Sequence, residues 1–143
     1  MANARSELPS WLPRAMLLMV ITLVIIGACL PNTSLAYLRS EFRWLGRPLN
    51  WIDSYSGSID LTHVLLFALL GLVAYWALHR LSLLVLAGLM VLLAAISELV
   101  QIWVPGRQPG LNDFADDLLG LLIGVICAWI LHRLWLFAMC RRR

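Results

Sequence analysis

Four long runs of apolar residues, separated by short polar stretches, dominate the sequence. They cover about residues 15–30, 61–78, 81–104 and 113–134. Each is near the roughly 20 residues that an α-helix needs to cross the hydrocarbon core of a bilayer. The pattern predicts an all-α membrane protein with four transmembrane helices, folded as a single domain over residues 1–143.

The longest polar stretch, residues 31–59, lies between the first and second predicted spans. Apolar residues recur in it at spacings of three and four, at Leu35, Leu38, Phe42 and Leu45. Arginines recur on another side, at Arg39, Arg43 and Arg47. This pattern predicts a short amphipathic helix on the membrane surface, with an ordinary polar loop as the alternative. Glycine, proline and serine from Gly46 onward predict that the rest of the stretch is a loop.

Composition supports the membrane class. The chain is 62% hydrophobic and 13% charged, with a mean hydropathy of +0.84, far from the average of soluble domains. All 11 basic residues are arginine, which excludes Schiff-base chemistry on lysine. Much of the net charge of +3 comes from the tail Arg141–Arg143, which we interpret as an anchor at anionic headgroups rather than a nucleic-acid site.

Three scattered cysteines, Cys29, Cys127 and Cys140, form neither a disulfide framework nor a zinc motif. The four residues Ile26–Cys29 resemble a bacterial lipoprotein cleavage box. Cleavage before Cys29 is therefore the alternative to a retained first helix. Because the chain starts at Met1, we expect the helix to be retained.

The distribution of arginines predicts the orientation in the membrane. With four spans, one side carries Arg5, Arg14, Arg80, Arg133 and Arg141–Arg143. The other side carries Arg39, Arg43, Arg47 and Arg107. Because cytoplasmic segments are enriched in arginine, both termini are predicted to be cytoplasmic.

This topology gathers the unusual polar residues in the outer third of the membrane. They are Asp60, His63, Glu98, Gln101, Arg107, Asp113, Asp116 and Asp117. Ionisable residues inside a membrane are costly, so their concentration at one depth indicates a functional site. The inner half has no comparable group, which argues against a proton-transport path across the whole membrane.

Spacing predicts which of these side chains share a helix face. Glu98 and Gln101 are three residues apart, and Asp113 and Asp117 are four apart. Glu98 should lie about 9 Å below the helix end, where it is expected either to be protonated or to face a partner. We expect Arg107 to be that partner, with His63 as the alternative.

Structural roles are the alternative for some of these positions. Asp60 and Asp113 stand where a helix N-cap is expected. Gly120 and Gly124 form a small-xxx-small face, which we expect to serve helix packing rather than chemistry.

Two kinds of chemistry fit the cluster. His63, Glu98, Asp113 and Asp117 are suitable ligands for a divalent cation, and the carboxylates favour magnesium, calcium or manganese. Without a metal, the catalytic candidates are Glu98, His63 and Asp113, with His63 and Glu98 as an acid–base pair. A serine nucleophile is not indicated, because Ser97, the one candidate, is expected to face away from Glu98.

Several motifs in this region resemble the VanZ-like family of integral membrane proteins. They are Glu98–Gln101, Val104–Arg107, Asp113 with Gly120 and Gly124, and the upstream His63 with Phe67, Leu70 and Gly71. The resemblance is strongest over residues 60–124. Two features depart from the family pattern: no lysine precedes His63, and Asp117 stands where asparagine is usual.

The resemblance implies a multi-pass protein of the bacterial plasma membrane, in a family named for low-level teicoplanin resistance. We predict an outer-leaflet pocket that binds the headgroup of a lipid or lipid-linked glycan. The predicted ligand-binding residues are Asp60, His63, Glu98, Gln101, Arg107, Asp113 and Asp117. Two alternatives stay open: a phosphoester or ester hydrolase, with or without a divalent cation, and a structural or accessory subunit.

Overall fold

The computed structural model describes residues 11–55 and 59–141, and every regular element in this part of the chain is an α-helix. The helices are α1 Leu12–Cys29, α2 Asn32–Glu41, α3 Arg43–Tyr55, α4 Leu61–Ala77, α5 Leu83–Gln101 and α6 Leu111–Arg141. The prediction of an all-α fold is confirmed.

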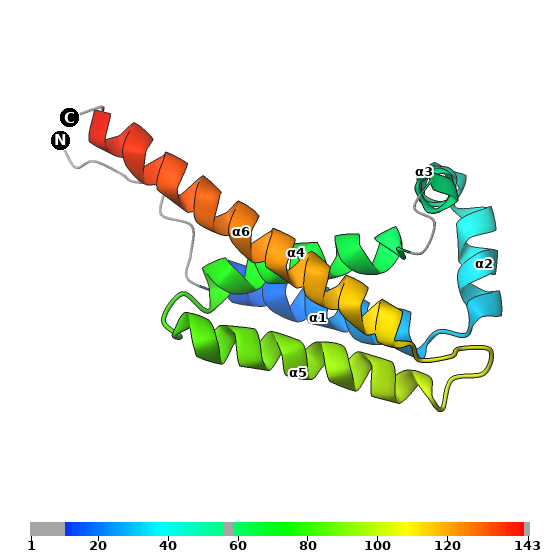
Figure 1. The fold of residues 1–143 in the computed structure, drawn as a ribbon. Coiled ribbons are helices and arrows are strands. Elements are labelled where there is room, and N and C mark those ends of the chain that lie inside the picture. The colour runs from blue at the N-terminus through cyan, green and yellow to red at the C-terminus, as the bar shows by residue number, and fades with distance from the viewer. Residues whose placement is uncertain (1–10, 56–58, 142–143) are drawn as a thin grey trace.

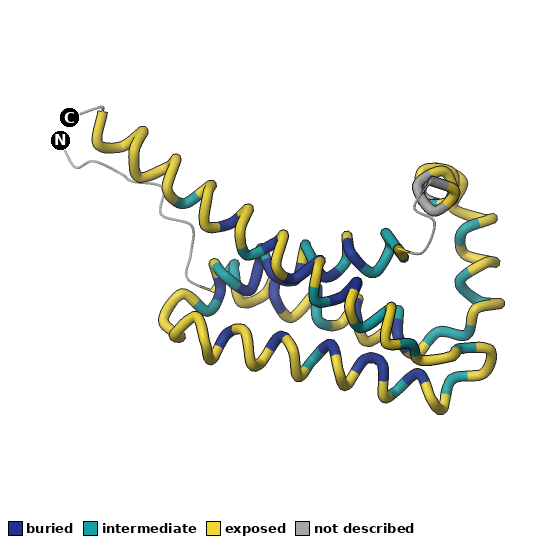
Figure 2. Tube along the Cα trace, in the orientation of Figure 1, coloured by how far each residue is buried: buried dark blue, intermediate teal, exposed yellow. Residues whose placement is uncertain are grey.

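Helix α4 lies at the centre of a bundle that it forms with α1, α5 and α6 (Figure 1). Its most extensive contacts are with α6, and those with α1 come next. The core contains Val20 and Val24 from α1, Phe67, Leu70 and Ala74 from α4, Met90 and Ala94 from α5, and Leu121 from α6. The buried positions of α1, α5 and α6 face inward, whereas their outer sides are exposed (Figure 2).

The outer surface of the bundle is rich in large apolar side chains. On α5, for example, Leu84 is 86% exposed and Leu92 is 56% exposed. A surface of this kind needs an apolar solvent, and a lipid bilayer provides one. Helices α1, α5 and α6 are long and apolar enough to cross a membrane. Helix α4 is equally apolar but has 17 residues, so it is about 25 Å long, and a fourth span stays a prediction.

Glycines allow α4 and α6 to approach closely. A Cβ atom at Gly120 would overlap the carbonyl oxygen of Val64, and one at Gly124 would overlap that of Ala68. Gly71 on α4 faces the backbone of Leu121 in the same way. These contacts confirm that Gly120 and Gly124 form a packing face. The packing also places the beginning of α6 beside the beginning of α4.

The segment between α1 and α4 differs from expectation. It contains two helices, α2 and α3, which lie across the end of the bundle (Figure 1). The prediction of a loop after Gly46 is wrong, because α3 continues to Tyr55 with Pro48 inside it. Gly46 is buried and has room for no side chain against the backbone of Arg39, so it serves the contact between α2 and α3. Whether these helices lie on a membrane surface stays a prediction.

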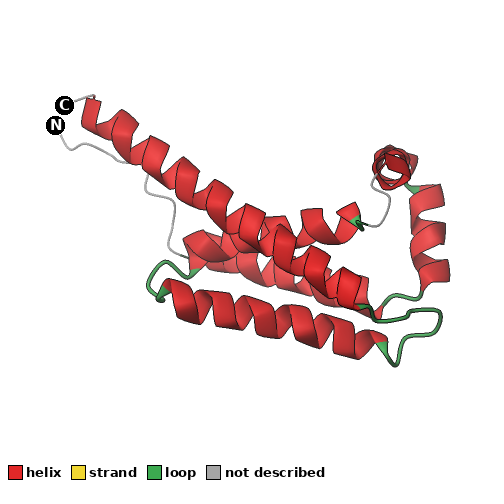
Figure 3. Cartoon of the chain, in the orientation of Figure 1, coloured by secondary structure: helices red, strands yellow, loops and turns green. Residues whose placement is uncertain are grey.

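Two helix ends also differ from expectation. Helix α5 ends at Gln101 instead of continuing to residue 104, so Glu98 lies in its last turn rather than two turns below the end. Helix α6 continues to Arg141 and extends beyond the bundle (Figures 1 and 3). The turns between α4 and α5 and between α5 and α6 occur where the sequence predicts them.

Candidate functional site

Three helix ends meet at one end of the bundle: the beginning of α4, the end of α5 and the beginning of α6 (Figure 1). Asp60 is the N-cap of α4, and its Oδ1 accepts hydrogen bonds from the backbone N–H groups of Thr62 at 2.9 Å and His63 at 3.3 Å. The backbone N–H of Asp60 donates to Asp116 Oδ2 at 2.7 Å. The two acids thereby hold the beginnings of α4 and α6 together, and Asp60 has the capping role expected as its alternative.

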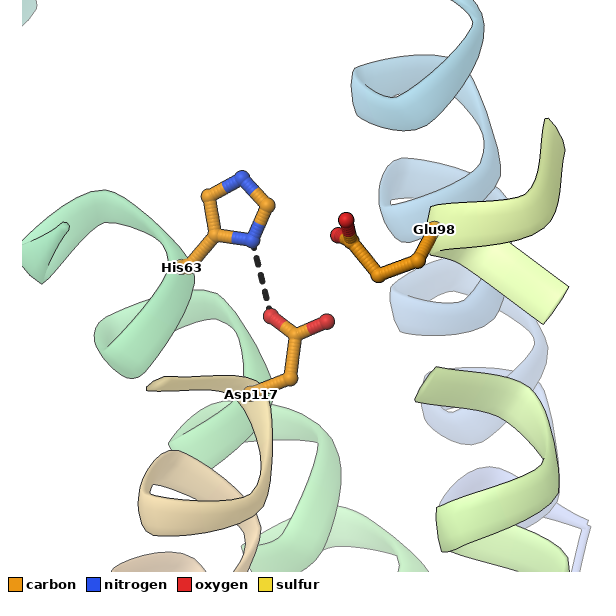
Figure 4. A group of neighbouring side chains, drawn as sticks. All are labelled: His63, Glu98 and Asp117. Carbon is orange, nitrogen blue, oxygen red and sulfur yellow. Dashed lines mark hydrogen bonds and ion pairs between the residues drawn. The ribbon is translucent and has the colours of Figure 1, made fainter. Parts of the chain in front are cut away.

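A histidine and an aspartate form the centre of this region. His63 Nδ1 lies 2.8 Å from Asp117 Oδ1, and the Asp117 side chain is completely buried. Asp117 Oδ2 accepts a long hydrogen bond, 3.4 Å, from the hydroxyl of Ser97. The second ring nitrogen of His63 points away from Asp117 (Figure 4). This pairing fixes the orientation of the imidazole and leaves its second nitrogen for another partner.

Glu98 approaches the pair from α5, and its carboxylate is directed toward the pair (Figure 4). Its Oε1 accepts from Gln101 Nε2 at 3.3 Å, and its Oε2 accepts from the backbone N–H of Gly110 at 3.1 Å. One ligand atom each from His63, Glu98 and Asp117 lies within 4.8 Å of the others. One imidazole and two carboxylates at this separation can hold a divalent cation after small side-chain movements.

Arg107 does not pair with Glu98 as expected. Its guanidinium donates to the carbonyl oxygens of Gly27, at 3.0 Å from the terminal nitrogen, and Leu30, at 3.3 Å from Nε. Both carbonyls belong to the end of α1, where a cation satisfies unpaired acceptors and the helix dipole. Arg107 therefore caps α1. The side-chain amide of Gln101 and the backbone amide of Gly110 bind Glu98 instead of the expected guanidinium.

Asp113 lies outside the central cluster. It is the third residue of α6 and is half-buried. The backbone N–H of Phe114 donates to the carbonyl of Gly110, so the helix begins before Asp113 and the structural alternative, an N-cap role for Asp113, is wrong. Asp113 lines a polar cavity together with Asp60.

Two neighbouring cavities adjoin the cluster. The first, of about 330 Å³, is mainly apolar, and its lining comes from α1, α2, α3, α4, α5 and the loop after α5. It is lined by Val24, Gly27, Ala28, Leu35, Leu38, Arg39, Phe42, Leu49, Thr62, His63, Leu66, Phe67, Ser97, Gln101 and Arg107. The second, of about 530 Å³, is lined by Asn32, Asp60, Gln101, Gly106, Arg107, Gln108 and Asp113. The two cavities share Gln101 and Arg107.

The sequence did not indicate every residue at this end. Ser97 is buried and contacts Asp117, although its adjacency to Glu98 predicted another direction. Its spacing of four from Gln101 was the available signal, because such residues share a helix face. Arg39 donates to Thr62 Oγ1 at 3.0 Å and to Asn50 Oδ1 at 3.2 Å, and no local pattern predicts such links between α2, α3 and α4.

Comparison with known protein families shows to which family the chain belongs. Residues 14–132 match the model of the VanZ/LLP1 family. The chain belongs to this family. The match extends beyond the motifs at residues 60–124 and includes α1, α2 and α3, so the helices that wall the apolar cavity are part of the VanZ-like domain. No curated protein and no solved structure matches the chain. The family and the apolar helices together define a VanZ-like membrane protein of the cell envelope.

Proposed function

We propose that this VanZ-like protein binds a membrane lipid or a lipid-linked glycan. The observation that carries the proposal is the junction of an apolar and a polar cavity with Gln101 and Arg107 in both walls. An amphipathic ligand fits this junction, with its chain in the first cavity and its headgroup in the second. Both volumes are in the range of small-molecule sites.

The polar cavity offers both hydrogen-bond donors and acceptors. Arg107, Gln101, Gln108 and Asn32 supply N–H groups, whereas Asp60 and Asp113 supply carboxylates. A mixture of this kind suits a headgroup with hydroxyl groups and one anionic group near Arg107 better than a bare phosphate. His63 and Gln101 lie on the wall of the apolar cavity, where they face the junction between headgroup and chain.

We also propose that the protein lies in a bacterial plasma membrane, crosses it four times and has both termini in the cytoplasm. Arginine placement and the family support this topology. The polar cavity would then open toward the outer leaflet. A fluorescent protein that matures only in the cytoplasm, fused after Arg143, should fluoresce; a dark fusion that is present at full length would contradict the orientation.

Lipid mass spectrometry on gently purified protein tests the binding. The wild type should retain a defined lipid, and Gly27→Phe should lose it because the new ring occupies the apolar cavity. A Cβ at Gly27 meets only Leu66 Cδ2, at 3.9 Å, so the backbone accepts a side chain. Gly88→Phe is the matched control, since a Cβ there meets nothing within 4 Å. Equal lipid content in both variants would refute the proposal.

A hydrolase is the second candidate, and the pairing of His63 with Asp117 favours it. With Nδ1–H donated to the carboxylate, the second nitrogen can accept a proton from water while the water oxygen attacks an ester carbonyl or phosphorus. The same imidazole can return that proton to the departing alkoxide, which balances the step. A divalent cation on His63, Glu98 and Asp117 would instead supply a metal-bound water.

Turnover separates the two candidates. A hydrolase should cleave the co-purified lipid, and His63→Gln should abolish cleavage while the lipid stays bound. His79→Gln, at the opposite end, should cleave at the wild-type rate. Elemental analysis and a chelator would show whether cleavage needs a metal. If the wild type forms no product from its co-purified lipid, the hydrolase is excluded and the lipid-binding function is retained.

The family name connects the proposal to teicoplanin. We expect expression in a susceptible strain to reduce teicoplanin susceptibility and Gly27→Phe to cancel that effect, as measured by growth inhibition. Unchanged susceptibility on wild-type expression would remove this part of the proposal without affecting lipid binding.

A further inference from the structure

A second cavity region lies at the opposite end of the bundle, far from the VanZ motifs. It has a volume of about 490 Å³ and lies among the beginning of α1, the turn between α4 and α5, and α6. Four basic residues line it: Arg14 from α1, His79 and Arg80 from the turn, and His132 from α6. Basic groups from three separate segments therefore converge on one space.

Among the described residues, no acidic side chain lines this cavity. The described segments 11–40, 64–97 and 118–141, whose ends near this cavity provide its lining, contain no aspartate or glutamate, and Glu7 lies outside the described residues. Among the described residues, Arg14 and Arg80 form no ion pair with a carboxylate, and both are exposed. Two arginines in a cavity where the described residues provide no carboxylate favour an anionic ligand.

Local contacts orient the two imidazoles. His79 Nδ1 lies 3.2 Å from the carbonyl oxygen of Trp76, and His132 Nδ1 lies 3.2 Å from the Tyr75 hydroxyl. The Trp76 and His132 rings are 5.3 Å apart between centroids. Each imidazole uses Nδ1 within the protein, and Nε2 lies outside these contacts. The positive charge of the cavity therefore rests on Arg14 and Arg80.

Most of the remaining lining is apolar. Leu81 follows the basic residues in the turn, Leu83 and Leu86 continue along α5, and Leu83 is 64% exposed. Tryptophan beside such a boundary is typical of the level of lipid headgroups. Basic cavities between helices at the membrane interface suit anionic lipid headgroups.

We propose that this basic cavity binds the phosphate of an anionic glycerophospholipid from the leaflet at this end, with an acyl chain along Leu83 and Leu86. Free phosphate has the same charge chemistry but no chain. The site is independent of the lipid or glycan site at the other end, because the basic cavity shares no lining residue with the apolar cavity or the polar cavity there.

Native mass spectrometry in a mild detergent tests the site, with phosphatidylglycerol, phosphatidylcholine and inorganic phosphate as separate probes. The wild type should retain phosphatidylglycerol in preference to phosphatidylcholine. Arg14→Gln with Arg80→Gln should weaken retention roughly 30-fold, because each arginine near an anionic lipid contributes about a factor of five. Arg43→Gln with Arg47→Gln removes the same charge at the opposite end and should have no effect.

Three outcomes would overturn the proposal. They are equal retention of both lipids by the wild type, equal loss in the two double variants, and displacement of phosphatidylglycerol by millimolar phosphate, which would indicate a free-anion site. Should the Arg14/Arg80 variant not be monodisperse, Arg80→Gln alone replaces it, since Arg80 lies exposed in a turn outside the helices. The single variant should weaken retention roughly fivefold, and unchanged retention would also refute the site.

Discussion

The two ends of the bundle treat their ionisable groups in opposite ways. At the end formed by the beginnings of α4 and α6, carboxylates are buried and hydrogen-bonded: Asp117 is fully buried against His63, and Asp116 binds the backbone of Asp60. At the other end, Arg14 and Arg80 are exposed, and among the described residues neither forms an ion pair with a carboxylate. The buried carboxylates of the first end bind groups within the protein. The exposed arginines of the second end remain accessible to an external ligand.

This difference indicates that a chemical reaction would be located at the first end, and electrostatic attraction of a ligand at the second. A half-buried imidazole such as His63, which a buried carboxylate orients, has one geometry, which acid–base or metal chemistry requires. Exposed arginines have many geometries and act mainly through charge. Variants at the first end should therefore change stability and activity together, whereas those at the second should change lipid preference with little effect on stability.

The largest expected effect comes from separating α4 and α6. Gly120→Val would push a side chain into the backbone of Val64 and Ala68, and we expect a loss of more than about 3 kcal/mol or failure to fold. Gly88→Val places the same side chain where nothing lies within 4 Å and should be nearly neutral. Thermal unfolding in detergent measures both, and similar melting temperatures would disprove the close approach.

Much of this framework was predictable from sequence. The apolar runs predicted the helices of the bundle, and the spacing of Gly120 and Gly124 predicted their packing face. The antiparallel order of the predicted spans places Asp60, Glu98 and Asp117 at one end of the bundle. Local patterns did not predict the partners of Arg107, because these depend on where the end of α1 lies in space. Gly46 and Pro48 misled the prediction of α3, because tertiary contact with α2 outweighs their low helix propensity.

Next in size is the removal of Asp117. Asp117→Ala leaves His63 Nδ1 without its acceptor, whereas the Ser97 hydroxyl keeps the carbonyl oxygen of Ala94 at 2.8 Å. The loss should cost about 1–3 kcal/mol. Tyr75→Phe removes a histidine contact at the other end and should cost less than about 1 kcal/mol. Chemical unfolding of both variants compares the two ends directly. A larger loss for Tyr75→Phe would reverse the proposed contrast.

A smaller effect is expected for the arginine that caps α1. Arg107→Gln removes donors to Gly27 and Leu30 and should cost about 1–2 kcal/mol, chiefly through fraying of the end of α1. Hydrogen exchange on α1 measures the fraying. Arg80→Gln is the comparison, and it should leave exchange throughout α4 and α5 unchanged. Unaltered exchange in Arg107→Gln would mean that the cap does not stabilise α1.

The smallest effect concerns the cap of α4. Asp60→Ala should cost about 1 kcal/mol, because the N–H groups of Thr62 and His63 lose their acceptor. Asp60→Asn keeps an acceptor oxygen at this position and should lower the free energy of unfolding by only a few tenths of about 1 kcal/mol. Faster amide exchange confined to the beginning of α4 in the alanine variant is the signature. Equal exchange in both variants would contradict the capping role.

The limits of sequence reasoning are clearest at Glu98. Its position within an apolar run correctly marked it as a residue that needs partners. The partners are the amide of Gln101 and the backbone N–H of Gly110 rather than a guanidinium. Whether a loop folds back over a helix end depends on backbone geometry that charge complementarity cannot predict. The apolar cavity was likewise not predictable from sequence, since α2 and α3 contribute to its wall.

Photo-crosslinking with a lipid that carries a diazirine in the middle of its acyl chain tests the central claim most directly. After irradiation in native membranes, the account predicts adducts on residues of the apolar cavity such as Leu35, Leu66 and Phe67, and their loss in Gly27→Phe. Gly88→Phe should keep them. Adducts confined to the outer faces of α5 and α6, for example at Leu92 and Leu122, would show that lipid only surrounds the bundle and would contradict the account.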